Sequence, residues 1–519
     1  MKAHIVGGGF GGLAAAAYLI RHAEMPGQDI TIYEADERMG GGFFLGGNAT
    51  SGYNLPGSVF DAEFRCAFDL LAKIPSGRNQ DVSVKDEFFT FNKLHPFRDR
   101  AHIIDRDGKI VHGPHFGLSL RDGLDLAKLS LTPEAMLDGR RIEEFFSPQF
   151  FATEFWLLFS TIMGSLPKHS ATEFRRYINR TLRLLPYLSD MSQILRTPVN
   201  QYQAFVVPLV AWLQNRGVNF LTHAFVLDIE LAASPGITVN RLEYEREGKP
   251  ISVAVRLDDI VLVTTGSQTA DLAVGSMTQA PRSEANGRSW ALWKRLARGR
   301  ADFGNPDVFF DAAEAPYRRW VTFTVTTTGT EFINLMTTLT GSEPGSGGLV
   351  TLKDSCWLLS LTIFDQPEVI GQPHGAYVWW GYGLYPENKG KFVQKRMAEC
   401  NGEEILKEVV WQLRFDKQWD AIRRSSICIP CDMPYVNNIW MPRRRTDRPR
   451  PVPAGSTNLG LIGQYVEVEQ DVTFTIEYSA RTAWEAIRLL LKCGPPPPSV
   501  YQGQYDLRAL WGALKVLVC

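Results

Sequence analysis

The stretch that decides the fold is residues 3–41, AHIVGGGFGGLAAAAYLIRHAEMPGQDITIYEADERMGG. It runs from a short apolar strand through a glycine cluster into an alanine-rich helix, and then into a second strand. Gly7, Gly9 and Gly12 match the spacing G-x-G-x-x-G and stand directly between the first strand and the helix. Glycines at these positions allow a tight turn and let the main chain and the helix N-terminus approach a pyrophosphate. The stretch therefore predicts a βαβ unit that binds a dinucleotide.

The second half of this stretch favours FAD over NAD. Glu34 ends the second strand, 22 residues after Gly12, where an acid binds a ribose 2'-hydroxyl. Gly40 and Gly41 complete E-x5-G-G, the extended form seen in flavoproteins that resemble glutathione reductase. A second G-x-G-x-x-G for NAD(P)H is missing, which disfavours a pyridine-nucleotide reductase. The residues expected to contact FAD are Gly7, Gly9, Phe10, Gly11, Gly12, Glu34, Gly40, Gly41, Thr265, Gly266, Ser267 and Gly463.

Two of these assignments have a plainer alternative. A glycine-rich turn without a ligand would also explain the first motif, although the strand, helix, acid and second glycine pair around it make that reading weaker. Thr265, Gly266 and Ser267 follow the buried-strand run of residues 259–265, DIVLVTT. An ordinary strand end accounts for them as well as a cofactor contact does.

Composition excludes several classes of protein. A chain of 519 residues is too long for one core, and 45% apolar with 21% charged residues is typical of globular domains. The net charge of -1 argues against a nucleic-acid partner. The longest apolar run, residues 155–166, is too short for a transmembrane helix, and the N-terminus lacks a signal-peptide pattern. Seven scattered cysteines suggest reduced thiols, so we expect a cytoplasmic protein. His112 and His115 have no matching carboxylate or cysteine cluster, so we expect no metal site.

The order of segments predicts an α/β fold with interleaved lobes. A Rossmann-like FAD-binding lobe of the glutathione-reductase type is expected to be discontinuous, with inserted α+β substrate lobes and a C-terminal helical tail. Residues 51–200 are aromatic-rich and helical in pattern, whereas residues 320–327 and 356–363 suggest a second sheet. The expected boundaries are 1–50, 200–285 and 422–492 for the FAD lobe, 51–199 and 286–421 for the substrate lobes, and 493–519 for the tail.

Several long stretches resemble the oleate hydratase, or myosin-cross-reactive-antigen, family of FAD-dependent fatty-acid hydratases. They include ITIYEADERMGG, FFATEFWLLFSTIM, NQYQAFVVPLVAWL, WWGYGLYPENKGKFVQKRMAECNGEEIL, DMPYVNNIWMPRRRTDRP and FTIEYSARTAWEAI, and they cover nearly the whole chain. The resemblance implies FAD in the nucleotide lobe, an apolar channel for the acyl chain, and addition of water across a double bond without net redox change. It also implies a homodimer.

The implied chemistry asks for an acid and a water-activating base. An alkene is a poor base, so a positioned acid must protonate one carbon while another group activates water for its neighbour. The family uses a tyrosine as the acid, and Tyr202 in Asn200-Gln201-Tyr202 matches that motif, with a packed helix tyrosine as the structural alternative. The family's glutamate position falls on Val59, so the usual base is absent. Glu63, with Asp61 second, is the expected replacement, and a solvated acid at a helix start is the alternative.

The expected substrate is long and apolar, but the sequence leaves the chemistry of its head group undetermined. The family anchors the fatty-acid carboxylate with polar residues at positions that here hold Ile427, Ile429 and Asp432, which cannot receive a carboxylate in the same way. Double-bond isomerisation or cyclisation of a neutral polyene, terpenoid or polyketide-like chain is therefore an alternative to hydration. A flavin oxidoreductase and a flavin-stabilised binding protein are further alternatives. The leucine-spaced tail, residues 507–517, packs on the body or touches a membrane surface.

Overall fold

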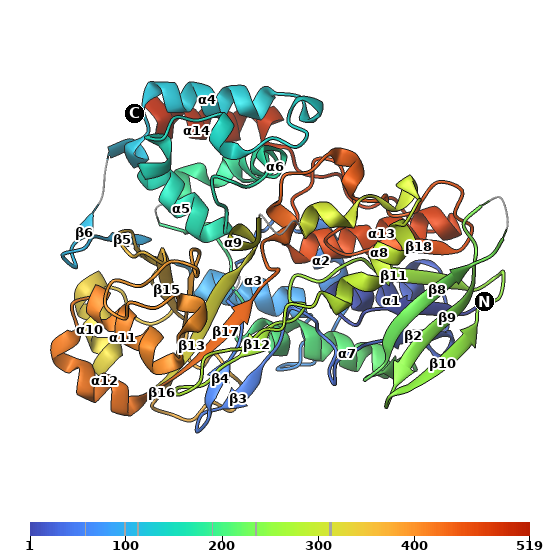
Figure 1. Ribbon diagram of the computed structural model, residues 1–519, viewed down its shortest axis with the longest axis horizontal. Helices are drawn as coiled ribbons and strands as arrows, with labels where there is room; N and C mark the ends of the chain where they lie inside the picture. The colour runs from blue at the N-terminus through green and yellow to red at the C-terminus, as the bar shows by residue number, and fades with distance from the viewer. Residues whose placement is uncertain are drawn as a thin grey trace.

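A computed structural model describes residues 1–57, 59–97, 100–111, 114–188, 190–233, 236–310 and 314–518. Figure 1 shows three bodies side by side: a parallel sheet with α1 and α13 at the right, a larger mixed sheet with α10, α11 and α12 at the lower left, and a helical group with α4, α5, α6 and α14 at the top. Below they are called the parallel-sheet lobe, the mixed-sheet lobe and the helical lobe. The fold is mixed α/β with a Rossmann-like lobe, and it agrees in class with the sequence prediction.

The parallel-sheet lobe collects its five strands from distant parts of the chain. In spatial order they are β18 (Leu459–Ile462), β11 (Ile260–Thr264), β1 (Ala3–Val6), β2 (Ile30–Tyr33) and β7 (Asn219–Leu221), and all neighbours pair in parallel. Helix α1 (Phe10–His22) begins directly after the glycine turn and packs against α13 (Ile476–Leu491). A small antiparallel sheet of β8 (Phe225–Leu231), β9 (Val239–Arg246) and β10 (Lys249–Ala254) extends this lobe.

Gly12 sets how closely α1 lies on β1. A Cβ at Gly12 would stand 2.0 Å from the carbonyl oxygen of Gly7, which is far inside van der Waals contact. Only glycine therefore permits this helix to approach the turn that precedes it. The alanines that follow are fully buried and let α1 pack closely in the lobe's core.

The mixed-sheet lobe is built on eight strands. In spatial order they are β12 (Ala273–Val274), β17 (Ser426–Met433), β13 (Trp320–Thr328), β16 (Ala376–Gly383), β15 (Leu359–Ile363), β14 (Val350–Leu352), β5 (His102–Ile104) and β6 (Ile110–Val111). The second sheet expected from residues 320–327 and 356–363 is thus present. Strands β12 and β17 fall inside the ranges we assigned to the FAD lobe, yet they pair in this sheet.

The region expected to be helical, residues 51–200, also contains short strands. The hairpin of β3 (Gly46–Asn48) and β4 (Gly52–Asn54) and the pair β5–β6 lie in or next to it. They are two or three residues long, so they carry too little alternation to be read from sequence. The remaining helices are α2 (Arg65–Leu71), α3 (Val84–Leu94), α4 (Leu120–Leu131), α5 (Glu154–Met163), α6 (Ala171–Thr181), α7 (Val207–Gln214), α8 (Ala291–Ala297), α9 (Ala315–Arg318), α10 (Glu331–Thr340), α11 (Gly402–Gln412), α12 (Trp419–Ser425) and α14 (Leu507–Val518).

The tail docks on the helical lobe through one face of α14. Ala509 and Ala513 pack on Leu182 and Leu185, which lie just after α6. Residues 494–499 form a proline-rich linker before α14. Arg481 of α13 holds this linker by donating a hydrogen bond to the carbonyl of Pro498. Across the described residues, no helix combines the length and apolarity that crossing a membrane needs.

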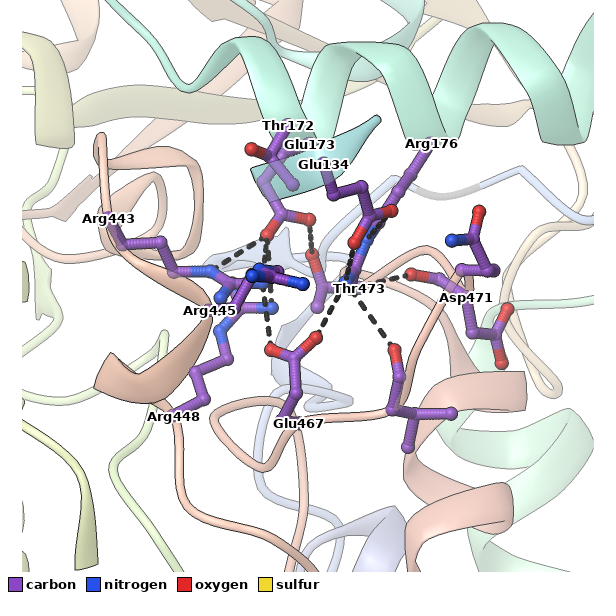
Figure 2. Close-up of polar contacts among 12 residues, drawn as sticks. Glu134, Thr172, Glu173, Arg176, Arg443, Arg445, Arg448, Glu467, Asp471 and Thr473 are labelled. Carbon is purple, nitrogen blue, oxygen red and sulfur yellow. Dashed lines mark hydrogen bonds and ion pairs between the residues drawn. The ribbon is translucent and has the colours of Figure 1, made fainter. Parts of the chain in front are cut away.

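A buried network of charges joins the helical lobe to the parallel-sheet lobe (Figure 2). Glu173 on α6 accepts from Arg443 at 2.7 Å and lies 3.2 Å from Arg448. Glu467, which follows β18, lies 2.9 Å from Arg443 and 2.6 Å from Arg176. The side chains of Glu173 and the three arginines are fully buried. The network therefore fixes α6 against the segments 443–448 and 467–473.

The arginines keep Glu173 ionised inside the protein. Burial alone would raise the pKa of this carboxyl, but the charges of Arg448, Arg443 and Arg176 outweigh burial and lower its pKa to about 2. A buried ion pair adds modest net stability compared with an apolar core, whereas the loss of one partner leaves an uncompensated buried charge. The network is thus sensitive to removal of any single member.

We expect Glu173→Gln to lower the free energy of unfolding by about 3 to 5 kcal/mol, because the substitution leaves buried arginines without their shared carboxylate. Chemical denaturation at neutral pH measures the change. Glu230→Gln is the matched control, since Glu230 pairs with Arg241 on the exposed surface, and its loss should change stability by less than about 1 kcal/mol. Equal effects of the two substitutions would contradict the role given to the network.

The stability that Glu173 contributes should depend on pH in one direction. An unfolded glutamate has a pKa of about 4.3, whereas the folded value is about 2, so the contribution is complete above the unfolded pKa and is lost as the pH falls toward the folded pKa. The difference in unfolding free energy between wild type and Glu173→Gln should therefore shrink between about pH 5 and pH 2. A difference that stays constant over this range would show that the ionised carboxylate is not what stabilises the fold.

Candidate functional site

One large cavity lies between the parallel-sheet lobe and the mixed-sheet lobe. Its volume is about 1210 Å³, and residues from both lobes line it. One end is formed by the glycine turn after β1 and the end of β2, and the other by aromatic side chains of β13 and β16. The cavity thus joins a polar end, called the glycine cradle below, to an apolar end, called the aromatic arm.

The glycine cradle contains most of the residues predicted to contact a dinucleotide. The predicted residues that line the cavity are Gly7, Gly9, Phe10, Gly11, Glu34, Gly40, Gly41, Gly266, Ser267 and Gly463. Gly12 is absent from this lining because it packs on the Gly7 carbonyl. Thr265 is fully buried, and its main-chain N–H donates to Ile462 of the neighbouring strand. Gly12 and Thr265 therefore support the cradle from the side that faces away from the cavity.

The two glycine motifs contact each other in space. The N–H of Gly40 donates to the carbonyl of Gly8 at 2.9 Å, and a Cβ on Gly41 would stand 3.0 Å from Cα of Gly9. Gly40 and Gly41 have φ of 127° and 53°, a region that favours glycine. The spacing between Glu34 and the glycine pair Gly40–Gly41 therefore reflects a turn that folds back onto the first glycine motif.

The cradle has the chemistry to hold a dinucleotide. Helix α1 has no side-chain cap and no acidic residue in its first turn, so its first N–H groups and its dipole favour an anion. Glu34 accepts hydrogen bonds from the N–H of Gly8 at 2.7 Å and of Asp36 at 2.9 Å, and burial raises the pKa of this carboxyl. The buried hydroxyls of Thr264 and Thr265 have no hydrogen-bond partner among the described residues. These features fit a nucleotide with two phosphates.

The resemblance implies an apolar channel, but the residues that line the aromatic arm were not predicted from the sequence. Along β13, Val321 and Phe323 pack on the side covered by α10 and α11, so the alternating residues Trp320 and Thr322 face the cavity. Trp380 of β16 completes this wall. Other apolar residues of the arm are Phe60, Phe64, Met433, Val436 and Phe474. A run such as WVTFTV indicates a buried strand, but alternation does not tell which face meets a cavity.

Tyr202, the predicted proton donor, lies beside the cradle and is not part of the cavity lining. It begins a π-helical turn, Tyr202–Val206, that leads into α7. A Cβ on Gly40 would lie 3.2 Å from Cε2 of Tyr202, so the tyrosine ring packs against the turn that lines the cavity. Such π-helical turns occur frequently at functional sites. The ring is half-buried in the core of the parallel-sheet lobe.

The loop that resembles the family's glutamate loop presents an apolar residue to the cavity. Val59 lines the cavity and is 39% exposed. Asp61 is buried and paired with Arg183, and Glu63 is paired with Arg65 at 2.7 Å. Neither acid is part of the cavity lining. The structure thus brings Asp61 and Glu63 near the cavity wall with each carboxylate already bound to an arginine.

The residues at the family's carboxylate-anchor positions are engaged in packing. Ile427 and Ile429 of β17 approach Gly52 of β4, where a Cβ would lie 2.6 Å and 2.9 Å from their side chains. Asp432 is buried and accepts from Nε and Nη2 of Arg319, both at 2.6 Å. None of the three lines the cavity. A carboxylate head group in the cavity therefore needs another partner.

The sequence matches a known family over most of its length. The model of the MCRA family matches residues 1–487. An oleate hydratase from Streptococcus pyogenes serotype M49 (strain NZ131) is 33% identical, with 99% of this chain and 89% of the relative covered. A linoleate hydratase from Lactiplantibacillus plantarum is 30% identical, with 93% of this chain and 92% of the relative covered.

Solved structures with low sequence identity share the fold. Cyclohexylamine oxidase from Brevibacterium oxydans aligns with a TM-score of 0.54 at 13% identity, over 95% of this chain and 98% of its own. A putrescine oxidase with redesigned cofactor binding aligns with a TM-score of 0.55 at 11% identity, over 95% of this chain and 99% of its own. These likenesses support the Rossmann-like assignment of the parallel-sheet lobe.

Proposed function

The chain belongs to the MCRA family, and from that premise we propose that it is a hydro-lyase that adds water to a carbon–carbon double bond of a long, apolar, fatty-acid-like substrate. The relatives named oleate hydratase and linoleate hydratase support this assignment over nearly the full chain. The observation that carries it here is the continuous cavity, because one space of about 1210 Å³ joins the glycine cradle to the aromatic arm. A long chain in the arm would lie end-on to a group held in the cradle.

FAD is the cofactor we propose for the cradle. The pattern of Glu34, Gly40 and Gly41 favours it, and the free N-terminus of α1 suits its pyrophosphate. In a reaction without net electron transfer, bound FAD would supply structural and electrostatic support. Gly9, Gly11 and Gly463 would let the main chain approach it closely.

Two different residues of the chain would carry out the two proton transfers, one to the alkene and one from water. Tyr202 is the proposed acid: its phenol proton goes to one alkene carbon while the water oxygen bonds to the other carbon. Glu63, with Asp61 as second candidate, would take the proton that the water loses. Glu63 is the better candidate because Asp61 is buried with Arg183, whereas the Glu63 side chain is 27% exposed and directly precedes the cavity residue Phe64.

The apolar loop around Val59 supports a second reaction, isomerisation or cyclisation of the substrate. With Val59 in the cavity wall and both nearby acids bound to arginines, a cation formed by protonation would lose a proton before water attacks. That outcome is isomerisation or cyclisation of the substrate. It would suit a neutral polyene, terpenoid or polyketide-like chain, and the packing of Ile427 and Ile429 is compatible with such a substrate.

We also propose a peripheral membrane contact at the helical lobe, where a long apolar substrate would enter from lipid. Helices α4 and α14 lie next to each other (Figure 1), and both carry exposed apolar and basic residues. The exposed residues are Leu120, Arg121, Leu124, Lys128, Leu131, Leu507, Arg508, Leu510, Trp511, Leu514 and Lys515. Apolar and basic residues on one face are the combination that binds an anionic bilayer surface. The homodimer implied by the resemblance stays a prediction.

Incubation of the purified holoenzyme with oleic or linoleic acid in heavy-oxygen water tests the reaction. Hydration predicts a hydroxylated product that carries the heavy oxygen. A product without the label would replace hydration by isomerisation or cyclisation. Bleaching of the flavin absorbance on anaerobic mixing with substrate would instead indicate an oxidoreductase.

Tyr202→Phe should lower kcat by about 100-fold or more and leave the KM nearly unchanged, because general acid catalysis typically contributes 10²- to 10⁴-fold. Tyr187→Phe is the matched control, since Tyr187 is exposed on the helical lobe and should retain full activity. Steady-state kinetics with one substrate compares the two variants. Full activity of Tyr202→Phe would remove the tyrosine from the mechanism.

Two glycine substitutions separate contact with FAD from packing of the cradle. A Cβ on Gly9 would have only ordinary contact with Gly41 at 3.9 Å, and the Gly9 backbone is extended, so Gly9→Ala should fold normally and lose bound flavin. Gly12→Ala should lower the melting temperature, because its Cβ would collide with the Gly7 carbonyl. Flavin absorbance per mole of protein and thermal unfolding measure the two effects. Normal flavin content in Gly9→Ala would contradict the proposed binding mode.

A further inference from the structure

Arg180 is a buried cation without a charged partner. It lies on α6 and is 2% exposed. Its Nη2 donates to the main-chain carbonyl of Glu63 at 2.8 Å, whereas Nε and Nη1 are buried and have no hydrogen-bond partner among the described residues. In the part of the chain that the structure describes, it forms no ion pair. A buried guanidinium in this state is costly, because burial removes water from all three nitrogens and the Glu63 carbonyl replaces it at Nη2 alone.

Other arginines around this point have a carboxylate each. Arg176 binds Glu134 and Glu467, Arg183 binds Asp61, and Arg65 binds Glu63. The carboxylates that these arginines bind are therefore already neutralised. Arg180 differs from these arginines, because no ion pair joins it to a carboxylate among the described residues.

Arg180 lies behind the wall of the cavity. The carbonyl that it contacts belongs to Glu63, and the next residue, Phe64, lines the aromatic arm together with Phe60. The arginines that themselves line the cavity, Arg38 and Arg288, belong to the end formed by β2 and β8, where Arg288 lies over Phe225. Among the described lining residues of the aromatic arm there is no lysine or arginine. Arg180 is thus a described cation whose hydrogen-bond partner directly precedes a residue of the cavity wall.

We propose that Arg180 binds the carboxylate of the substrate at the end of the aromatic arm, in a site that substitutes for the anchor positions occupied by Ile427, Ile429 and Asp432. This inference rests on the proposed function and specifies the head group of its substrate. Guanidinium binds a carboxylate in two parallel hydrogen bonds, and Nε and Nη1 are the nitrogens free to do so. They have almost no exposed surface, so the head group reaches them when a wall side chain such as Phe64 turns aside.

Binding of two ligands of equal chain length tests the site without requiring turnover. Equilibrium dialysis of the holoenzyme with radiolabelled oleic acid and with radiolabelled oleyl alcohol measures the preference for the charged head group. Wild type should prefer the acid, and Arg180→Gln should weaken binding of the acid by about 10- to 100-fold while binding of the alcohol changes little. Arg180→Lys should recover part of the preference, because it restores the charge without the paired hydrogen bonds.

Arg175→Gln is the matched control, since Arg175 is a buried arginine of the same helix that already has Glu134 as partner. It should leave the preference for the acid unchanged, and thermal unfolding reports whether each variant is folded. An equal loss of acid and alcohol binding in Arg180→Gln, the same loss in Arg175→Gln, or a wild type without preference would overturn the proposal. Failure of the proposed function is a separate result, namely absence of hydrated product from wild type, and it leaves the binding comparison valid.

Discussion

The rest of the structure depends on the buried ionic contact between Glu173 on α6 and the arginines 443 and 448. A cavity lined by two lobes keeps its shape only if those lobes and the helices behind them hold fixed positions. Glu173 and Glu467 together bind three buried arginines, so helix α6 and the segment after β18 cannot shift independently. Arg180 and Arg183 follow on the same helix and on the turn after it, next to the loop at Asp61 and Glu63. The network that holds the lobes together thus also places the cations near the aromatic arm.

Local rules were enough to predict the parallel-sheet lobe. The strand, glycine turn, helix, acid and second glycine pair are set by φ angles, close approach and helix packing, and those constraints act within 40 residues or at direct contacts. The predicted cradle residues therefore line the cavity, apart from Gly12 and Thr265, which are buried behind it. The return of β18 and α13 to this lobe was also visible in the pattern of the chain.

The aromatic arm and the charge network depend on long-range placement that a pattern does not contain. Trp320 and Trp380 are read as core residues of strands, and only the assembled sheet shows that they face a cavity. A run of arginines such as that at residues 443–450 is typical of a solvated surface, whereas the fold buries Arg443 and Arg448 against Glu173. Residues 422–492 are expected in the FAD lobe, yet β17 within this range pairs with β13, which lies about 100 residues earlier in the chain. The roles of Tyr202, Asp61 and Glu63 stay predictions.

The central claim is that one cavity holds FAD in the glycine cradle and the acyl chain in the aromatic arm. A crystal structure of the holoenzyme soaked with oleic acid tests it most directly. The account predicts flavin density against Gly7, Gly9 and Gly40, and a chain that runs past Trp320 and Trp380 with its carboxylate beside Arg180. A chain bound outside this cavity, or flavin density away from the cradle, would contradict it.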